Sequence, residues 1–213
     1  LISIKYRSLP ASSVSSMSSL SKFSSITSLE TNSPLSEYPS FKLIFGNEIY
    51  LIDQNSYKNT TEYYHFILLA KDAIGHQQIR ELSTRAWGRS WMTGKIRRVP
   101  TYYQDLIDIV GSNPGHVIAS TACLGGFLPK AILRYNRAPS TQMYENIKNW
   151  CLSVQGIFGK GNFYLEMQPS KNDEQLIVNK FLKDLSNELG IKYIITTDSQ
   201  YLKKEDAHIH KAY

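Results

Sequence analysis

The sequence predicts an α/β fold, in which helices connect the strands of a parallel sheet. From about Tyr64 onward, short apolar segments alternate with longer segments whose apolar residues recur at helical spacing. The 213 residues, of which 42% are hydrophobic, suffice for one domain with its own core. An open sheet and a closed barrel both show this alternation, and in both the chemistry gathers where strands end.

The first forty residues differ in composition from the rest. Of the 25 serines, 14 lie between Ser8 and Ser40, without helical or strand periodicity. Such a run buries too little apolar area to offset the entropy lost on ordering. We therefore predict a tail over residues 1–40, either disordered or not native to the domain, and a domain over residues 41–213.

The first predicted elements are two strands and a helix. Phe41 to Ile52 is rich in aliphatic and aromatic residues and predicts a strand, bent at Gly46. A polar loop follows at Ser56 to Thr61, and Tyr64 to Ala70 predicts a buried strand. Asp72 can cap the next helix. Its apolar residues lie broadly on one face: Ile74, Ile79, Leu82 and Ala86.

The middle of the chain predicts a basic loop, a helix and a strand. The loop is Gly88 to Pro100, and Thr101 with Gln104 fits a capping box for a helix that ends at Gly111. His116 to Thr121 predicts a strand, followed by a tight turn at Cys123 to Gly126.

Five further elements complete the alternation. Ser140 caps a helix with apolar residues at helical spacing, and Asn162 to Gln168 predicts a strand. A helix opens at Asn172 and closes at Gly190, and Lys192 to Thr197 predicts a strand that ends at Asp198. A last helix is predicted near Lys204.

Composition excludes several classes of protein. The formal net charge of +6 permits an anionic partner without demanding one. Two cysteines cannot form a disulfide framework, which favours a reducing compartment. The longest apolar run, Phe66 to Ala70, is too short to cross a bilayer. We therefore expect a cytoplasmic protein without a membrane partner.

Four side chains are candidate metal ligands: Glu48, His65, Cys123 and Asp198. Asp198 and Cys123 follow predicted strands, and Glu48 lies within an apolar one, where a buried charge is costly unless it is paired or metal-bound. Each has an ordinary alternative: a capping Asp198, a solvent-facing Glu48, a small buried Cys123 and a half-buried His65 whose hydrogen bonds are satisfied within the fold. His65 stands at the start of a strand, which counts against a ligand role. Together they suit a zinc- or manganese-type site acting on a phosphoester.

The basic loop supplies the candidate nucleic-acid contacts, Arg97 and Arg98. Four basic residues make a weak footprint, and a solvated loop is the alternative. The sequence contains no Walker loop, dinucleotide fingerprint or Ser-His-Asp signature.

Four segments, in order, resemble the polymerase and histidinol phosphatase (PHP) domain at the amino end of bacterial DNA polymerase III alpha subunits and their phage relatives. The first is Tyr64 to Lys71 followed by Gly75, and the second is the cysteine–leucine–glycine turn within Ile118 to Gly126. The third is Phe163 to Gln168, with Glu174-Gln175 and Val178-Asn179; the last is Thr196 to Leu202, with Glu205-Asp206-Ala207. The resemblance covers roughly Phe41 to Tyr213.

The resemblance implies a distorted (β/α)7 barrel, incomplete at its amino end, with a polynuclear site for a divalent metal (zinc, manganese or iron). Glu48, His65, Cys123 and Asp198 match ligand positions of the family. The family's amino-terminal histidine pair should precede Phe41, where this chain has no histidine, and Gln200 replaces a histidine. A full trinuclear site therefore cannot assemble from this chain alone.

Three functions follow as hypotheses. In the first, the chain is a structural, metal-poor PHP module of a DNA-directed DNA polymerase (a nucleotidyltransferase of DNA replication). The polymerase active site lies outside the chain, and the partners are the rest of the alpha subunit, DNA and replisome subunits. In the second, it is a metal-dependent phosphoesterase, of 3′–5′ exonuclease or pyrophosphatase type. In the third, it is a nucleic-acid-binding module.

Overall fold

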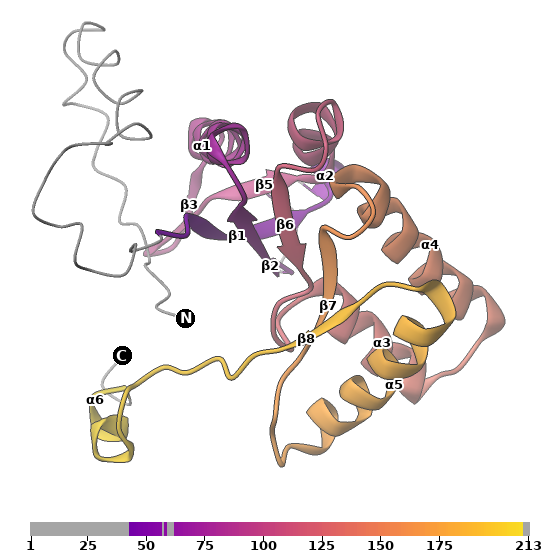
Figure 1. The fold of residues 1–213 in the computed structure, drawn as a ribbon. Coiled ribbons are helices and arrows are strands. Elements are labelled where there is room, and N and C mark those ends of the chain that lie inside the picture. Colours follow the sequence, from indigo (N-terminus) through magenta and orange to yellow (C-terminus); the bar gives the residue numbers. More distant parts are fainter. Residues whose placement is uncertain (1–42, 57, 59–61, 211–213) are drawn as a thin grey trace, which may run out of the picture. The chain divides into compact units, whose positions relative to one another are not determined.

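A six-stranded mixed sheet lies at the centre of the computed structural model from Phe45 onward, in the order β5-β1-β2-β6-β7-β8 (Figure 1). Its strands are β1 (Gly46–Ile52), β2 (Tyr64–Ala70), β5 (Pro100–Tyr102), β6 (Val117–Ser120), β7 (Phe163–Met167) and β8 (Tyr193–Ile195). The structure describes residues 43–56, 58 and 62–210. The predicted tail, residues 1–40, lies outside the described residues.

Strand β2 runs against both of its neighbours, β1 and β6, whereas the β5–β1, β6–β7 and β7–β8 pairs are parallel. The prediction of a parallel sheet is therefore wrong for this strand. For the β1–β2 pair the reason is the connection between the two strands, residues 53–63, which is too short to hold a crossover helix. The strand pattern alone does not reveal direction.

Helices flank the sheet (Figure 1). The longer ones are α1 (Ala73–Gly88), α3 (Phe127–Arg137), α4 (Thr141–Phe158) and α5 (Asp173–Leu189), and the shorter ones are η5 (Gln54–Ser56), α2 (Tyr103–Leu106), the π-helix η6 (Ile107–Gly111), η7 (Lys204–Asp206) and α6 (Ala207–His210). The predicted caps are confirmed: Asp72, Ser140 and Asn172 each accept a hydrogen bond from a backbone N–H of the first helical turn. Gly190 ends α5 in the left-handed conformation, with φ 66°.

The helices and one face of the sheet share a single apolar core. Ile49 and Leu51 of β1 and Phe66 and Leu68 of β2 are buried there with apolar side chains from α1, η6, α3, α4 and α5. Residues of the opposite face alternate with these along the strands. They are partly exposed on β1 and β2, where they include Glu48, Tyr50, His65 and Ile67. We call this the open face of the sheet.

Between Gly88 and Arg137 the structure differs from the prediction in three places. The basic loop holds a two-stranded antiparallel ribbon of β3 (Trp91–Thr93) and β4 (Ile96–Arg98). Thr101 is not a cap but a buried residue of β5, and the carboxylate that accepts the backbone N–H of Tyr102 belongs to Asp105. Helix α3 had no counterpart in the prediction. Gly126 caps it without a side-chain hydrogen bond, so no capping residue marks its start.

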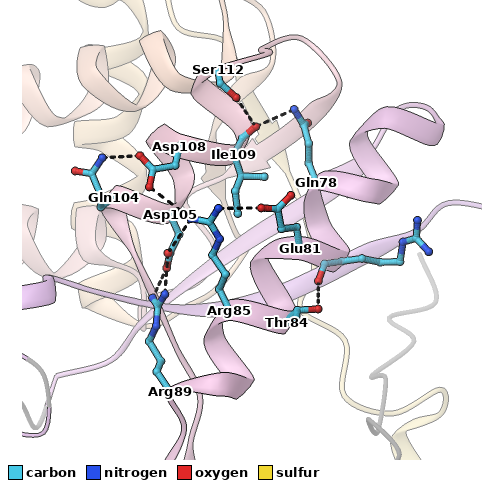
Figure 2. A network of polar contacts seen from close by, with 11 residues as sticks. Gln78, Glu81, Thr84, Arg85, Arg89, Gln104, Asp105, Asp108, Ile109 and Ser112 are labelled. Carbon is cyan, nitrogen blue, oxygen red and sulfur yellow. Dashed lines mark hydrogen bonds and ion pairs between the residues drawn. The ribbon is translucent and has the colours of Figure 1, made fainter. Parts of the chain in front are cut away.

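A buried carboxylate, Asp105, joins α1 to α2 (Figure 2). Its two oxygens accept hydrogen bonds from the guanidinium of Arg89, directly after α1, and that of Arg85 lies within 3.9 Å. Arg85 also pairs with Glu81 at 2.9 Å and with Asp108 at 3.5 Å. Because a buried carboxylate is costly unless it is compensated, these contacts fix the end of α1 against the start of α2.

The edge strand β8 exposes apolar side chains. Tyr193 is 42% exposed and Ile195 is 69% exposed. At the opposite edge Pro100 and Thr101 of β5 are buried.

Within the described residues, no helix is long and apolar enough to cross a membrane.

We predict that Asp105→Ala lowers the free energy of unfolding by about 2 to 4 kcal/mol, because it leaves Arg89 without its carboxylate in a partly buried position. The matched control is Asp108→Ala, whose side chain is 45% exposed and whose loss should cost less than about 1 kcal/mol. Urea denaturation with an unchanged m-value measures both. Equal losses in the two variants would contradict the role given to Asp105.

Candidate functional site

Three of the four predicted metal-site side chains meet on the open face of the sheet. The Oε1 atom of Glu48 lies 2.7 Å from Nδ1 of His65, and the Sγ atom of Cys123 lies 3.7 Å from the same nitrogen. Glu48 comes from β1, His65 from β2 and Cys123 from the turn after β6. Segments 75 residues apart in the chain therefore supply one cluster, which we call the Glu48–His65–Cys123 cluster.

The reversed direction of β2 brings this cluster together. Because β2 runs antiparallel to β1 and β6, its first residues lie beside the last residues of these two strands. His65 therefore lies at the same end of the sheet as the turn of Cys123, although it stands at the start of its own strand, and its assignment as a metal ligand stays a prediction. Its backbone N–H donates to the carbonyl of Gly125, and it forms a parallel bridge with Gly126.

The turn that carries Cys123 depends on glycine. A Cβ atom at Gly126 would lie 2.2 Å from the carbonyl oxygen of Thr121, and one at Gly125 would lie 3.1 to 3.3 Å from the imidazole of His65. Ala122, just before the cysteine, has φ 57°. The close packing of this turn holds the sulfur near the imidazole.

The surroundings of His65 favour its charged form. Hydrogen bonding to Cys123 and to the Glu48 carboxylate raises the pKa of His65 to about 10, against the opposing effect of partial burial. The side chains of His65 and Glu48 are 33% and 35% exposed, so solvent weakens the attraction between them. Glu48 therefore faces an imidazole whose protonated form is favoured by its contacts.

The arrangement limits the chemistry that the cluster can do. In a nucleophilic triad the acid and the nucleophile use opposite nitrogens of the imidazole, whereas here Glu48 and Cys123 both approach Nδ1. For a metal, the donor types are suitable, but Glu48 and Cys123 are both engaged with Nδ1 of His65, a nitrogen that a metal would otherwise use. Among the described residues, no group of three or more such side chains could hold a metal ion. As arranged, the residues do not fit the polynuclear site that the resemblance implies.

The hydrogen bonds of Asp198 in the described part of the chain are made within its own segment and not with this cluster. Asp198 is exposed, with φ 47°, in the segment after β8, and its carboxylate accepts a hydrogen bond from Nε2 of Gln200 at 3.0 Å. Gln200 is the residue that replaces a family histidine. The assignment of Asp198 as a ligand stays a prediction, as it does for the other three residues.

A second carboxylate on the open face received no role in the sequence prediction. Glu166 of β7 is only 7% exposed and accepts hydrogen bonds from Ser120 of β6, from Thr196 after β8 and from Gln168. Its position as a charge within an apolar strand is visible in the sequence, but its hydroxyl partners are not. These bonds tie three adjacent strands together.

The candidate nucleic-acid residues Arg97 and Arg98 lie side by side on β4 but in different surroundings. Arg97 is exposed, whereas Arg98 is half-buried with its guanidinium 4.4 Å from the centre of the Tyr63 ring. Only Arg97 presents its charge to solvent.

Comparison with known proteins identifies relatives over most of the chain. It is 40% identical over 189 residues to the probable DNA polymerase YorL of Bacillus subtilis, and equally to the DNA-directed DNA polymerase of Bacillus phage SPbeta. It is 33% identical over 171 residues to the DNA polymerase III subunit alpha of Borreliella burgdorferi. These matches cover 81%, 81% and 78% of the chain and 14% of each relative. The chain thus spans about one seventh of the length of these relatives.

A family model, that of the PHP domain, matches residues 15–170. The match begins within the serine-rich segment and extends through β7. It includes Glu48, His65 and Cys123 but ends before Asp198. Since the model covers more than half of the chain, the chain belongs to the PHP domain family.

Proposed function

We propose that this chain is the PHP-domain part of a replicative DNA polymerase of the alpha-subunit type, and that the whole protein synthesises DNA. The observation that carries this proposal is the family match together with relatives named DNA polymerase or DNA polymerase III subunit alpha. The partners would be the rest of the polymerase, DNA and replisome subunits. The role of the chain within that protein is structural.

The open face supports the proposal that the sheet belongs to a (β/α)7 barrel. In such barrels the helices lie outside, and side chains of the inner strand faces fill the interior. Here the described helices share one apolar core with one sheet face, while the other carries Glu48, His65 and the buried Glu166. Polar side chains that point to the interior near the ends of strands are typical of this architecture.

The structural role rests on the Glu48–His65–Cys123 cluster. Its members contact one another across β1, β2 and the turn after β6, so they connect three parts of the domain. A working phosphoesterase needs donors that converge on metal ions and a water. The phosphoesterase alternative is therefore less well supported than the structural role.

We predict that residues of this chain can replace the matching segment of YorL. A chimaera in which they substitute for the 189 matched residues should extend a primed template, because the polymerase active site is supplied by the remainder of YorL. The 213-residue chain alone should not. Primer extension on gels measures both. A folded chimaera without any extension would contradict the proposed function, and YorL with the segment deleted is the control for its necessity.

The purified chain should bind less than one tightly held metal ion, because its donors contact one another instead of a common point. Elemental analysis by mass spectrometry after dialysis measures this. Hydrolysis of a nitrophenyl phosphodiester in the presence of Mn²⁺ should be the same for the chain and for its Asp198→Asn variant. Two or three bound ions, or a Mn²⁺-dependent rate that Asp198→Asn abolishes, would favour the phosphoesterase instead.

The imidazole of His65 should titrate near pH 10, and Glu48→Gln or Cys123→Ser should each move its pKa toward the ordinary value of about 6.5. Because the pKa is raised in the folded state, the charged pair stabilises the fold fully below about pH 6.5. This contribution is lost as the pH rises through about 10. NMR titration of the ring protons measures the shift. Titration near pH 6.5 in the unmodified chain would show that the cluster is not an ion pair.

A further inference from the structure

The ribbon of β3 and β4 lies in a segment that carries several basic residues and no acidic one. From Trp87 to Arg98 the chain contains four arginine and lysine residues and no aspartate or glutamate. The strands pair Trp91 with Arg98, Met92 with Arg97 and Thr93 with Ile96, and Gly94 turns the chain with φ 59°. We call residues 91–98 the cationic ribbon.

Two of the four basic residues anchor the ribbon at its base. Arg89 binds the buried carboxylate of Asp105 and lies 4.1 Å from the centre of the Tyr102 ring (the Asp105 contact is seen in Figure 2). Arg98 stacks on Tyr63, whose ring also lies 6.3 Å from that of Trp91. These charges are engaged by the body of the domain, and they hold the ribbon in a fixed position.

The other two basic residues, Lys95 and Arg97, are exposed near the tip. The guanidinium of Arg97 donates a hydrogen bond to the hydroxyl of Ser90, which orients it without neutralising it. Beside them, Met92 is 53% exposed and Ile96 is 55% exposed. The tip therefore combines two exposed cations with two exposed apolar side chains, above a base at which Arg89 and Arg98 are engaged.

We propose that the cationic ribbon contacts double-stranded DNA. Lys95 and Arg97 bind backbone phosphates, and Met92 and Ile96 make apolar contacts at the groove. A two-stranded ribbon fits the major groove, and apolar side chains flanked by Lys and Arg are also used at the minor groove. The charge selects an anionic partner, and the choice of DNA rests on the proposed function. The contact orients the domain on DNA without reading sequence.

The test is the salt dependence of DNA binding by the 213-residue chain. Fluorescence anisotropy with a labelled duplex of about 20 base pairs, between about 50 and 200 mM NaCl, gives the slope of log affinity against log salt. For Lys95→Ala with Arg97→Ala, two phosphate contacts are lost. We expect affinity at low salt to fall about tenfold or more and the slope to become shallower by about 1 to 2.

The matched control is Lys180→Ala with Lys183→Ala, which removes the same charge from exposed positions of α5. It should leave the slope unchanged. Met92→Ser with Ile96→Ser should weaken binding without changing the slope, since apolar contacts release no counterions. Circular dichroism confirms that each variant is folded.

Equal losses in the ribbon and α5 variants, or an unchanged affinity of the ribbon variant, would overturn the inference. The latter result would leave a protein surface as the partner of the ribbon. Neither outcome bears on primer extension by the YorL chimaera, so failure of this inference can be told from failure of the proposed function.

Discussion

The direction of β2 is the constraint on which the candidate site depends. A strand that runs antiparallel to its neighbours has its first residues beside the last residues of those neighbours. His65 therefore contacts Glu48 and the turn of Cys123 at one end of the strands. If β2 ran parallel to its neighbours, His65 would lie at the other end of the strands, away from Cys123. The same direction places the Gly125 carbonyl opposite the His65 N–H, which joins the turn to the sheet. The antiparallel direction of β2 thus determines both the pairing of the strands and the position of the candidate site.

Most helices and strands could be predicted from residues that are close together in the sequence. Contacts between residues far apart in the sequence could not. Asp72, Ser140 and Asn172 mark helix starts because capping is decided within one turn. The buried pairing of Asp105 with Arg89 could not be anticipated, because it depends on how α1 packs against α2. Chain direction in β2 was likewise missed.

The candidate site shows the same division. Residue type and resemblance selected Glu48, His65 and Cys123, and the structure brings these three side chains together. The chemistry that these side chains can carry out depends on which imidazole nitrogen each of them contacts. For Cys123 that contact is determined by the close packing of the turn around Gly125 and Gly126. No sequence pattern encodes it. The hydroxyl partners of Glu166 were hidden for the same reason.

The two edges of the described sheet differ in whether they can accept another strand. At the β5 edge Pro100 has no N–H to donate, and it is buried with Thr101. At the β8 edge the backbone is not interrupted by proline, and Tyr193 and Ile195 expose apolar surface that a neighbouring strand can cover. Within the described sheet, the β8 edge is therefore the one that can accept a further strand, whereas the β5 edge is closed to one.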